Sequence, residues 1–248
     1  MDTVSDAIPY LPLLTTVLSV LFGTAILRRR AALKAYDGQP RTHLLWWGIG
    51  VYFFGVGTIV EGLTGVFGWS AIGFKAWYIS GALLGGAPLA QGTVFLLVGR
   101  QGAKVLAIVL VTYISIASVF ILLSPLNPPP AGENVLNGDV LEWQWVRLFS
   151  PLVNTYAALF LIGGAIYSAF AFRAQRGRSA GNALIALGAI LPGIGGSFSR
   201  AGHTEVLYVT EFIGIIFIYA GYRLAIGQRL WGSAPAPAPQ APAPQQAT

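Results

Sequence analysis

Two carboxylates, Glu205 and Glu211, stand within Gly202–Ala225, an apolar stretch long enough to cross a bilayer. A carboxylate near mid-bilayer costs at least a few kcal/mol, so such residues usually face a bundle interior, a partner or a water-filled cavity. Successive helical residues are rotated by about 100°, so these two side chains lie about 120° apart and form no acid pair by themselves. We expect Glu205 to face water and Glu211, about two turns deeper, to face inward.

Helical geometry gives Glu211 a polar stripe, because Thr204, Tyr208 and Tyr222 fall within about 60° of it. Glu61 in an earlier apolar stretch has the same character. At helical spacings of three and four, its neighbours are small or weakly polar: Gly57, Thr58, Thr64 and Gly65. Such a face suits close helix packing, so Glu61 is also predicted to point into the bundle.

Other polar groups could complete a site with these acids. Those predicted at comparable depth on other helices are Asn154 and Tyr156, with Gln91 lying deeper. The nearest cations are Lys75, Arg147, Arg200 and His203. A buried carboxyl group without a cation nearby would hold its proton, because burial favours the neutral form, and the sequence leaves either state open.

The combined set predicts a ligand site in one half of the bundle, formed by Glu61, Glu211, Tyr208, Asn154, Tyr156, Lys75 and Arg200. Intramembrane ionisable residues favour such a functional interpretation. Two structural alternatives remain. The acids could be interhelical hydrogen-bonding groups that fix the register of the helices, or they could lie at the lipid interface.

Composition explains which elements must position these residues. The 248-residue chain is 55% hydrophobic and 10% charged, whereas an ordinary soluble domain is roughly 25% charged. Its apolar stretches run continuously for about 20 residues, which predicts membrane-spanning helices rather than a β-barrel. The fold class is therefore all-α, a polytopic seven-helix bundle. The predicted spans are about Pro9–Leu27, Leu44–Val66, Phe74–Val98, Ala103–Leu123, Leu148–Phe172, Asn182–Phe198 and Thr204–Leu224.

These spans divide the chain into a transmembrane domain, residues 1–232, with a long extracytoplasmic loop at 124–147 and a disordered Ala/Pro-rich cytoplasmic tail at 233–248. Glycine patterns in the third and sixth spans predict close packing rather than hinges. Pro88 and Pro192 could still kink their helices. The arginines near the N-terminus follow the first apolar run, so that run is predicted to be a retained helix rather than a signal peptide.

Basic residues set the predicted orientation. Twelve of the fifteen fall on one side: Arg28, Arg29, Arg30, Lys34, Arg41, Arg100, Lys104, Arg173, Arg176, Arg178, Arg223 and Arg229. The N-terminus is therefore expected outside and the C-terminus in the cytoplasm, in a bacterial inner (plasma) membrane. The lipid bilayer is the expected partner. Nucleic acid is not, because no basic stripe with interleaved aromatics lies outside the spans.

Several chemistries lack the residues they require. The chain has no cysteine, none of its three lysines lies inside the predicted bundle to bind retinal, and His43 and His203 fall at opposite interfaces. No phosphate-binding loop, metalloprotease helix or nucleophile elbow occurs. We expect no enzymatic activity, no catalytic residue, no cofactor and no metal.

The second and third spans carry a family resemblance. An acid late in one helix, Lys and Trp at the start of the next, and Gly before Pro farther in are here Glu61, Lys75, Trp77, Gly86 and Pro88. This order resembles the seven-helix N-terminal sensor region of bacterial histidine kinases and diguanylate cyclases. The resemblance implies an N-terminus outside. Because only the Ala/Pro-rich tail follows the last span, it also implies a sensor that acts through a separate signalling partner.

The leading hypothesis is a sensor or receptor that binds a small or lipophilic ligand in an outer-half cavity between the second, third, fifth and seventh spans. A small transporter or proton-coupled carrier, in which Glu61 or Glu211 takes up and releases protons, is the first alternative. A structural or assembly subunit of a membrane complex is the second.

Overall fold

The structure is a computed structural model that describes residues 8–130 and 136–227. Within these ranges, seven spans are each long and apolar enough to cross a membrane. The described residues form no strand, apart from one isolated antiparallel bridge between Leu126 and Leu141. The all-helical architecture predicted from composition is confirmed. The predicted tail, residues 233–248, lies outside the described residues.

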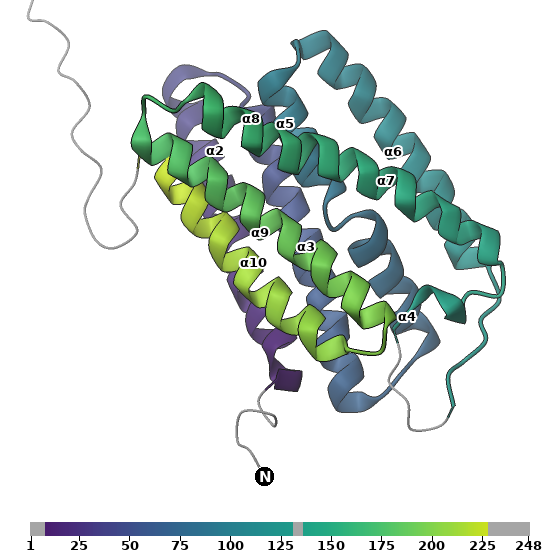
Figure 1. Cartoon of the computed structure of the whole chain (residues 1–248). Helices are drawn as coiled ribbons and strands as arrows, with labels where there is room; N and C mark the ends of the chain where they lie inside the picture. The colour runs from purple at the N-terminus through teal and green to yellow at the C-terminus, as the bar shows by residue number, and fades with distance from the viewer. Residues whose placement is uncertain (1–7, 131–135, 228–248) are drawn as a thin grey trace, which may run out of the picture.

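Four of the spans are single helices in the first and last parts of the chain (Figure 1). They are α2 (Leu11–Asp37), α3 (Thr42–Phe67), α9 (Arg176–Arg200) and α10 (Thr204–Ala225). A short 3-10 turn, η1 (Ile8–Tyr10), precedes α2. The fourth span is also a single helix, α6 (Arg100–Leu123), which lies at the periphery beside α7.

The third and fifth spans are composite. The third joins α4 (Ala71–Trp77), the π-helical η2 (Tyr78–Leu83) and α5 (Ala87–Leu97). The fifth joins the 3-10 turn η4 (Gln144–Leu148), α7 (Phe149–Ala157), the π-helical η5 (Ala158–Gly163) and α8 (Gly164–Ala171). Single π turns inside α-helices are frequent at functional sites.

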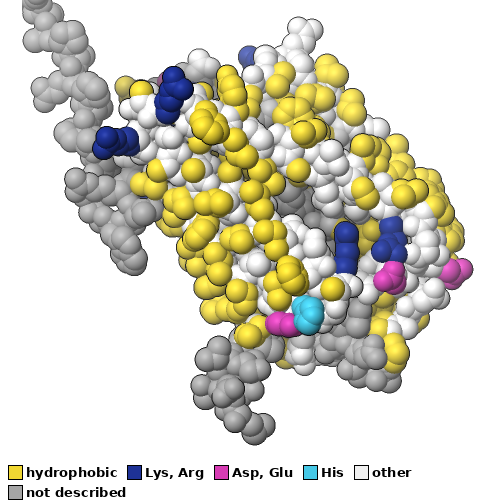
Figure 2. All heavy atoms as spheres, in the orientation of Figure 1, with side chains coloured by type: hydrophobic (Ala, Val, Ile, Leu, Met, Phe, Trp, Pro, Cys, Tyr) yellow, Lys and Arg dark blue, Asp and Glu magenta, His cyan; other side chains and the backbone are white. Residues whose placement is uncertain are grey.

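The helices alternate in direction, so each end of the bundle collects particular loops. We call the end that carries Arg28, Arg100, Arg173 and Arg223 the basic end, and the opposite end, with residues 124–130 and 136–143, the loop end. Figure 2 shows hydrophobic side chains over the middle of the visible face and charged ones near its two ends. This distribution fits a chain that spans a bilayer.

The first helix is longer than the sequence predicted. It ends at Asp37, ten residues beyond Leu27, where Gly38 adopts a left-handed φ of 70° and donates its N–H to the Lys34 carbonyl. The added segment is polar and contains no proline or glycine, so it remains helical beyond the apolar stretch. Gly38 then ends it as a left-handed C-cap.

The third span is interrupted, which corrects the expectation that its glycines serve packing alone. The Leu84 N–H bonds to the Ile79 carbonyl, a five-residue step, and helix resumes only at Ala87 with Pro88 in its first turn. A Cβ on Gly85 would lie 2.5 Å from the Gly81 carbonyl oxygen, so the break requires glycine there. In the sixth span, by contrast, α9 continues through Pro192.

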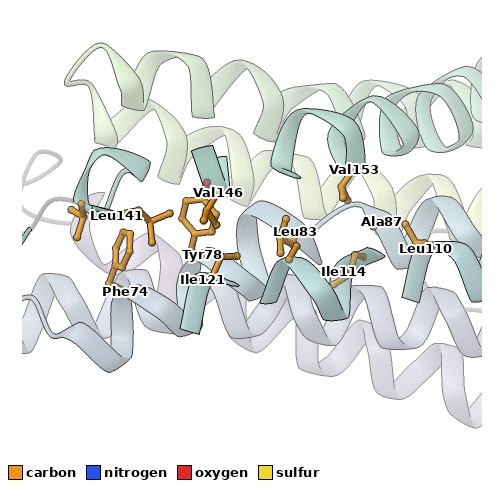
Figure 3. Packing of buried hydrophobic residues seen from close by; sticks show 12 residues of the cluster. Phe74, Tyr78, Leu83, Ala87, Leu110, Ile114, Ile121, Leu141, Val146 and Val153 are labelled. Atoms are coloured by element: carbon orange, nitrogen blue, oxygen red, sulfur yellow. The ribbon is translucent and has the colours of Figure 1, made fainter. Parts of the chain in front are cut away.

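A hydrophobic cluster near the loop end holds this interrupted span in place. Phe74, Tyr78 and Leu83 from the third span pack with Ile121 of α6 and Val146 of η4 (Figure 3). All five are at most 4% exposed. The cluster therefore fixes α4 and η2 against the fourth and fifth spans.

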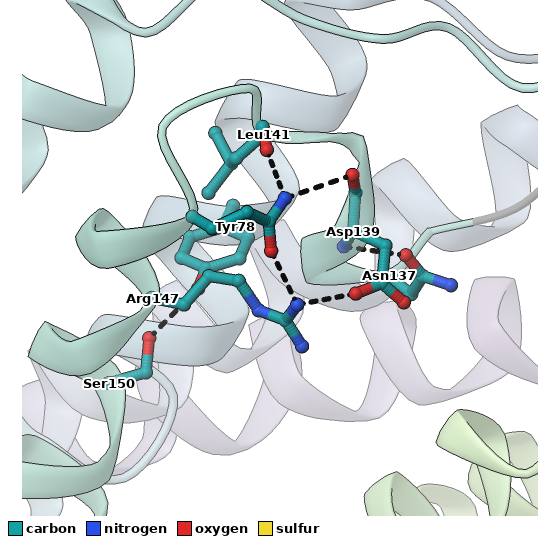
Figure 4. A network of polar contacts seen from close by, with 7 residues as sticks. Tyr78, Asn137, Asp139, Leu141, Arg147 and Ser150 are labelled. Atoms are coloured by element: carbon teal, nitrogen blue, oxygen red, sulfur yellow. Dashed lines mark hydrogen bonds and ion pairs between the residues drawn. The ribbon is translucent and has the colours of Figure 1, made fainter.

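The long loop predicted at 124–147 contains short 3-10 turns where it is described. Asn137 accepts the Asp139 N–H and caps η3 (Gly138–Val140), and Arg147 pairs with Asp139 and Gln144 (Figure 4). Tyr78 accepts a hydrogen bond from Ser150 at 3.3 Å. The Arg147 contacts attach the loop to the start of the fifth span, and the Ser150 bond joins that span to the third.

Candidate functional site

Glu61 lies in the part of α3 nearest the loop end and is 4% exposed. Its Oε1 accepts a 2.8 Å hydrogen bond from the indole nitrogen of Trp77, at the end of α4. The neighbouring helix α2 approaches closely, since a Cβ on Gly62 would lie 2.4 Å from a Leu13 methyl carbon. Glycine on this face lets helices pack tightly around the acid.

Glu211 reaches the same place from α10. It is 8% exposed, and its carboxyl group lies within hydrogen-bonding reach of that of Glu61. A proton on either acid would let the two share a hydrogen bond and would remove the repulsion between two carboxylates. The Oε2 atom of each acid is buried without a hydrogen-bond partner among the described residues. We call Glu61 and Glu211 the carboxyl pair.

Tyr208 belongs to the surroundings of the carboxyl pair. It lies one turn before Glu211 on α10, is partly buried, and is close enough to both acids to interact electrostatically. The polar stripe predicted on the last span therefore reaches the site through Tyr208. Tyr222, the far member of that stripe, lies in the last turn of α10 near the basic end.

Four residues of the predicted site lie elsewhere. Asn154 and Arg200 are exposed, and Lys75 donates a 2.7 Å hydrogen bond to the Leu122 carbonyl of α6. Tyr156 donates to Gln91 Oε1. The expectation that these side chains gather around Glu61 and Glu211 is therefore not met. Helix ends place charged groups in water, and Tyr156 finds its partner in the third span.

Tyr156 and Gln91 form a second polar cluster that is separate from the carboxyl pair. Gln91 is fully buried, and its Nε2 donates to the Ala103 carbonyl at 2.9 Å. The three residues come from α7, α5 and α6. A satisfied buried amide of this kind ties helices together without leaving a free polar group.

Trp77 belongs to the site but was not among the site residues predicted from the sequence. A tryptophan at the start of a membrane span is typical of the aromatic belt at the membrane interface, where tryptophan is common. Its place beside Glu61 in the family resemblance was the one available signal. The indole nitrogen would also lie 3.7 Å from a Cβ on Gly81, which is in η2. Trp77 therefore connects the carboxyl pair to the π-helical part of the third span.

The chemistry of the site follows from these groups. The described residues contain no group of three or more His, Cys, Asp or Glu that could hold a metal ion. The carboxyl pair offers acceptor oxygens, and the hydrogen bonds and ion pairs described for the two acids include no Lys or Arg. A complementary ligand would bring hydrogen-bond donors or positive charge.

Two cavities lie apart from the carboxyl pair. One, of about 410 Å³, is lined by Trp46, Pro88, Leu110, Ser115 and neighbouring apolar residues, beside the break in the third span. The other, of about 60 Å³, lies toward the basic end and includes Trp47 and Tyr222 in its wall. Neither is the predicted cavity between the second, third, fifth and seventh spans around Glu61 and Glu211.

Comparison with known proteins adds no relative. No protein-family model, no curated protein and no solved structure matches this chain.

Proposed function

We propose that this protein is a multi-pass membrane sensor or receptor whose ligand engages the carboxyl pair. Glu61 of α3 and Glu211 of α10 lie together beside the Trp77 indole, and this arrangement supports the proposal. Desolvating two acids costs free energy, and a purely structural hydrogen bond could be made by neutral residues at lower cost. A function for the acids accounts for their presence.

The ligand's chemistry follows from the pair. A small molecule with an ammonium or amide group donates to carboxyl oxygens. The orientation we propose puts the N-terminus and the loop end outside, by the distribution of Lys and Arg. The ligand then arrives from the extracytoplasmic side of a plasma membrane.

Signal transmission is proposed to run through the third span. A ligand between the two acids competes with Trp77 for Glu61, and the Trp77 indole adjoins Gly81 in η2. A π-helical segment followed by a break can change its hydrogen-bond register at lower cost than a continuous helix. A change of register in this segment would move α5 and change the arrangement of the helices at the basic end, where a separate signalling partner is proposed to bind.

The test measures binding to the purified full-length protein. Benzylammonium, benzamide and benzoate are compared by thermal unfolding in detergent at constant ionic strength, with hydrogen exchange of residues 78–86 as a second readout. We expect benzylammonium or benzamide, but not benzoate, to raise Tm and change exchange at the break. Glu211→Gln should weaken the response to the ammonium, and Glu205→Gln, at an exposed acid near the same end, should not. Equal responses in wild type and Glu211→Gln would refute this proposal.

A proton-coupled carrier is the second candidate, and the cavity near the basic end favours it. That cavity lies in the half of the bundle opposite the carboxyl pair, so it extends toward the other membrane face, which the path of a carrier must also reach. Liposomes containing the protein and an internal pH dye provide the test. Proton flux that is lost in Glu211→Gln supports a carrier, and absence of flux in the wild type excludes proton coupling.

A further inference from the structure

The 60 Å³ cavity lies between the spans and is partly open, since its wall includes Leu96 and Leu97, which are 50% and 42% exposed. Six of the seven spans contribute to its wall, all except α6. One residue from each is Phe22, Trp47, Thr93, Ala165, Asn182 and Tyr222. Most of the wall is apolar, so the cavity suits an occupant with an apolar part.

The Tyr222 hydroxyl is the unsatisfied polar group in this wall. Tyr222 is 4% exposed, and its hydroxyl oxygen is buried without a hydrogen-bond partner among the described residues. Its ring packs against Phe22, with centroids 5.5 Å apart, and edge-to-face against Trp47 at 6.2 Å. These contacts fix the ring, so the hydroxyl cannot turn far to reach another partner. A ligand acceptor would satisfy it.

Positive charge borders the same position. Arg29 follows Ile26 and Phe22 on α2 at spacings of three and seven residues, so it continues the helix face that lines the cavity. Arg29 and Arg223 are both close enough to Tyr222 to act electrostatically on its hydroxyl. In the part of the chain that the structure describes, Asp37 is the one acid at the basic end, and it pairs with Arg41. An anion from outside the chain therefore complements this charge.

We propose that the cavity binds a short-chain carboxylate that enters from the basic end. Its carboxylate would accept a hydrogen bond from Tyr222 and face Arg29, and its alkyl end would lie against Phe22 and Ala165. The enclosed volume holds only the alkyl end, because a whole six-atom molecule such as benzene occupies a cavity of about 150 Å³, so the carboxylate would lie in the opening toward the basic end. This site is distinct from the carboxyl pair, and its ligand has the opposite charge.

Butyrate is the probe, with n-butylammonium as the charge control and chloride to match ionic strength. Thermal unfolding of the full chain in detergent should show a Tm increase of about 2–4 °C with butyrate at concentrations well above its Kd, and none with n-butylammonium. Tyr222→Phe and Arg29→Gln should each lower the apparent butyrate affinity at least tenfold. Lys34→Gln, at an exposed basic residue on the same helix and end, should leave it unchanged.

A further variant tests the cavity itself. Ala165→Leu fills the space and should remove the butyrate response while the protein still unfolds cooperatively. An equal response in wild type and Tyr222→Phe, or no response in wild type at saturating butyrate, would overturn the proposal. Stabilisation by phosphatidylglycerol but not by butyrate would also overturn it, in favour of a lipid headgroup site. None of these outcomes depends on the Glu211→Gln result, so failure here and failure of the proposed receptor function are distinguishable.

Discussion

The indole nitrogen of Trp77 donates to Glu61 Oε1 at 2.8 Å, which joins the third span to an acid buried in the second. Trp77→Phe keeps an aromatic ring but removes part of the ring volume and leaves this carboxyl oxygen without its donor. We expect a loss of about 1–3 kcal/mol in the free energy of unfolding, because an unsatisfied buried acceptor pays its desolvation cost. Denaturant or thermal unfolding in detergent micelles measures it.

Trp69 supplies the matched control for this prediction. It lies at the same end and packs near Phe74, with ring centroids 6.4 Å apart, but its indole nitrogen is buried with no hydrogen-bond partner in the described part of the chain. Trp69→Phe removes a donor that bonds to nothing described, so it should cost less than Trp77→Phe. A larger loss in Trp69→Phe would show that indole packing, rather than the bond to Glu61, stabilises this region.

The contact between Glu61 and Glu211 predicts an energetic coupling. In a double-mutant cycle, Glu61→Gln and Glu211→Gln should show an interaction energy of about 1 kcal/mol or more, since the effects of substitutions at residues in direct contact are not additive. The same cycle with Glu205→Gln in place of Glu211→Gln should be additive, because Glu205 is exposed and contacts His203. Additivity in both cycles would contradict the contact.

The sequence predicted the spans well because apolar length alone determines which segments can cross a bilayer. It also predicted that Glu61 and Glu211 point into the bundle, which their exposures of 4% and 8% confirm. The contact between the two acids could not be derived, because the sequence shows which face of a helix is polar but not which neighbouring helix that face contacts.

The interruption at Gly85 was missed for a related reason. A small-residue repeat has the same sequence pattern whether it packs against a helix or ends one.

Asn154, Lys75 and Arg200 illustrate a second limit. Predicted depth placed each near the acids, but depth along a span does not specify the side of the helix that a residue occupies. Lys75 instead reaches the Leu122 carbonyl on α6, and the other two side chains are exposed. Trp77 was overlooked because an interfacial tryptophan is expected to contact lipid headgroups.

The Tyr156 hydrogen bond to Gln91 should contribute to stability independently of the carboxyl pair. Tyr156→Phe leaves Gln91 Oε1 without this donor in a fully buried position, so we expect a loss of about 1–2 kcal/mol in the free energy of unfolding. Tyr167→Phe, at a residue of the same span that is 64% exposed, should change it by less than about 0.5 kcal/mol. Similar losses in the two variants would show that the hydrogen bond contributes little.

The close contact between α9 and α10 should be sensitive to an added methyl group. A Cβ on Gly188 would lie 2.6 Å from the Gly214 carbonyl oxygen, so α9 and α10 touch through their backbones there. Gly188→Ala must push the two helices apart and should lower the free energy of unfolding by about 1–3 kcal/mol.

Gly193, five residues later on α9, supplies the matched control, because a Cβ there would meet no atom within 4 Å. Gly193→Ala should therefore be neutral or stabilising by up to about 1 kcal/mol, because alanine favours the helix. Thermal unfolding of both variants in the same detergent measures the difference, and equal stability would contradict the close approach of α9 and α10.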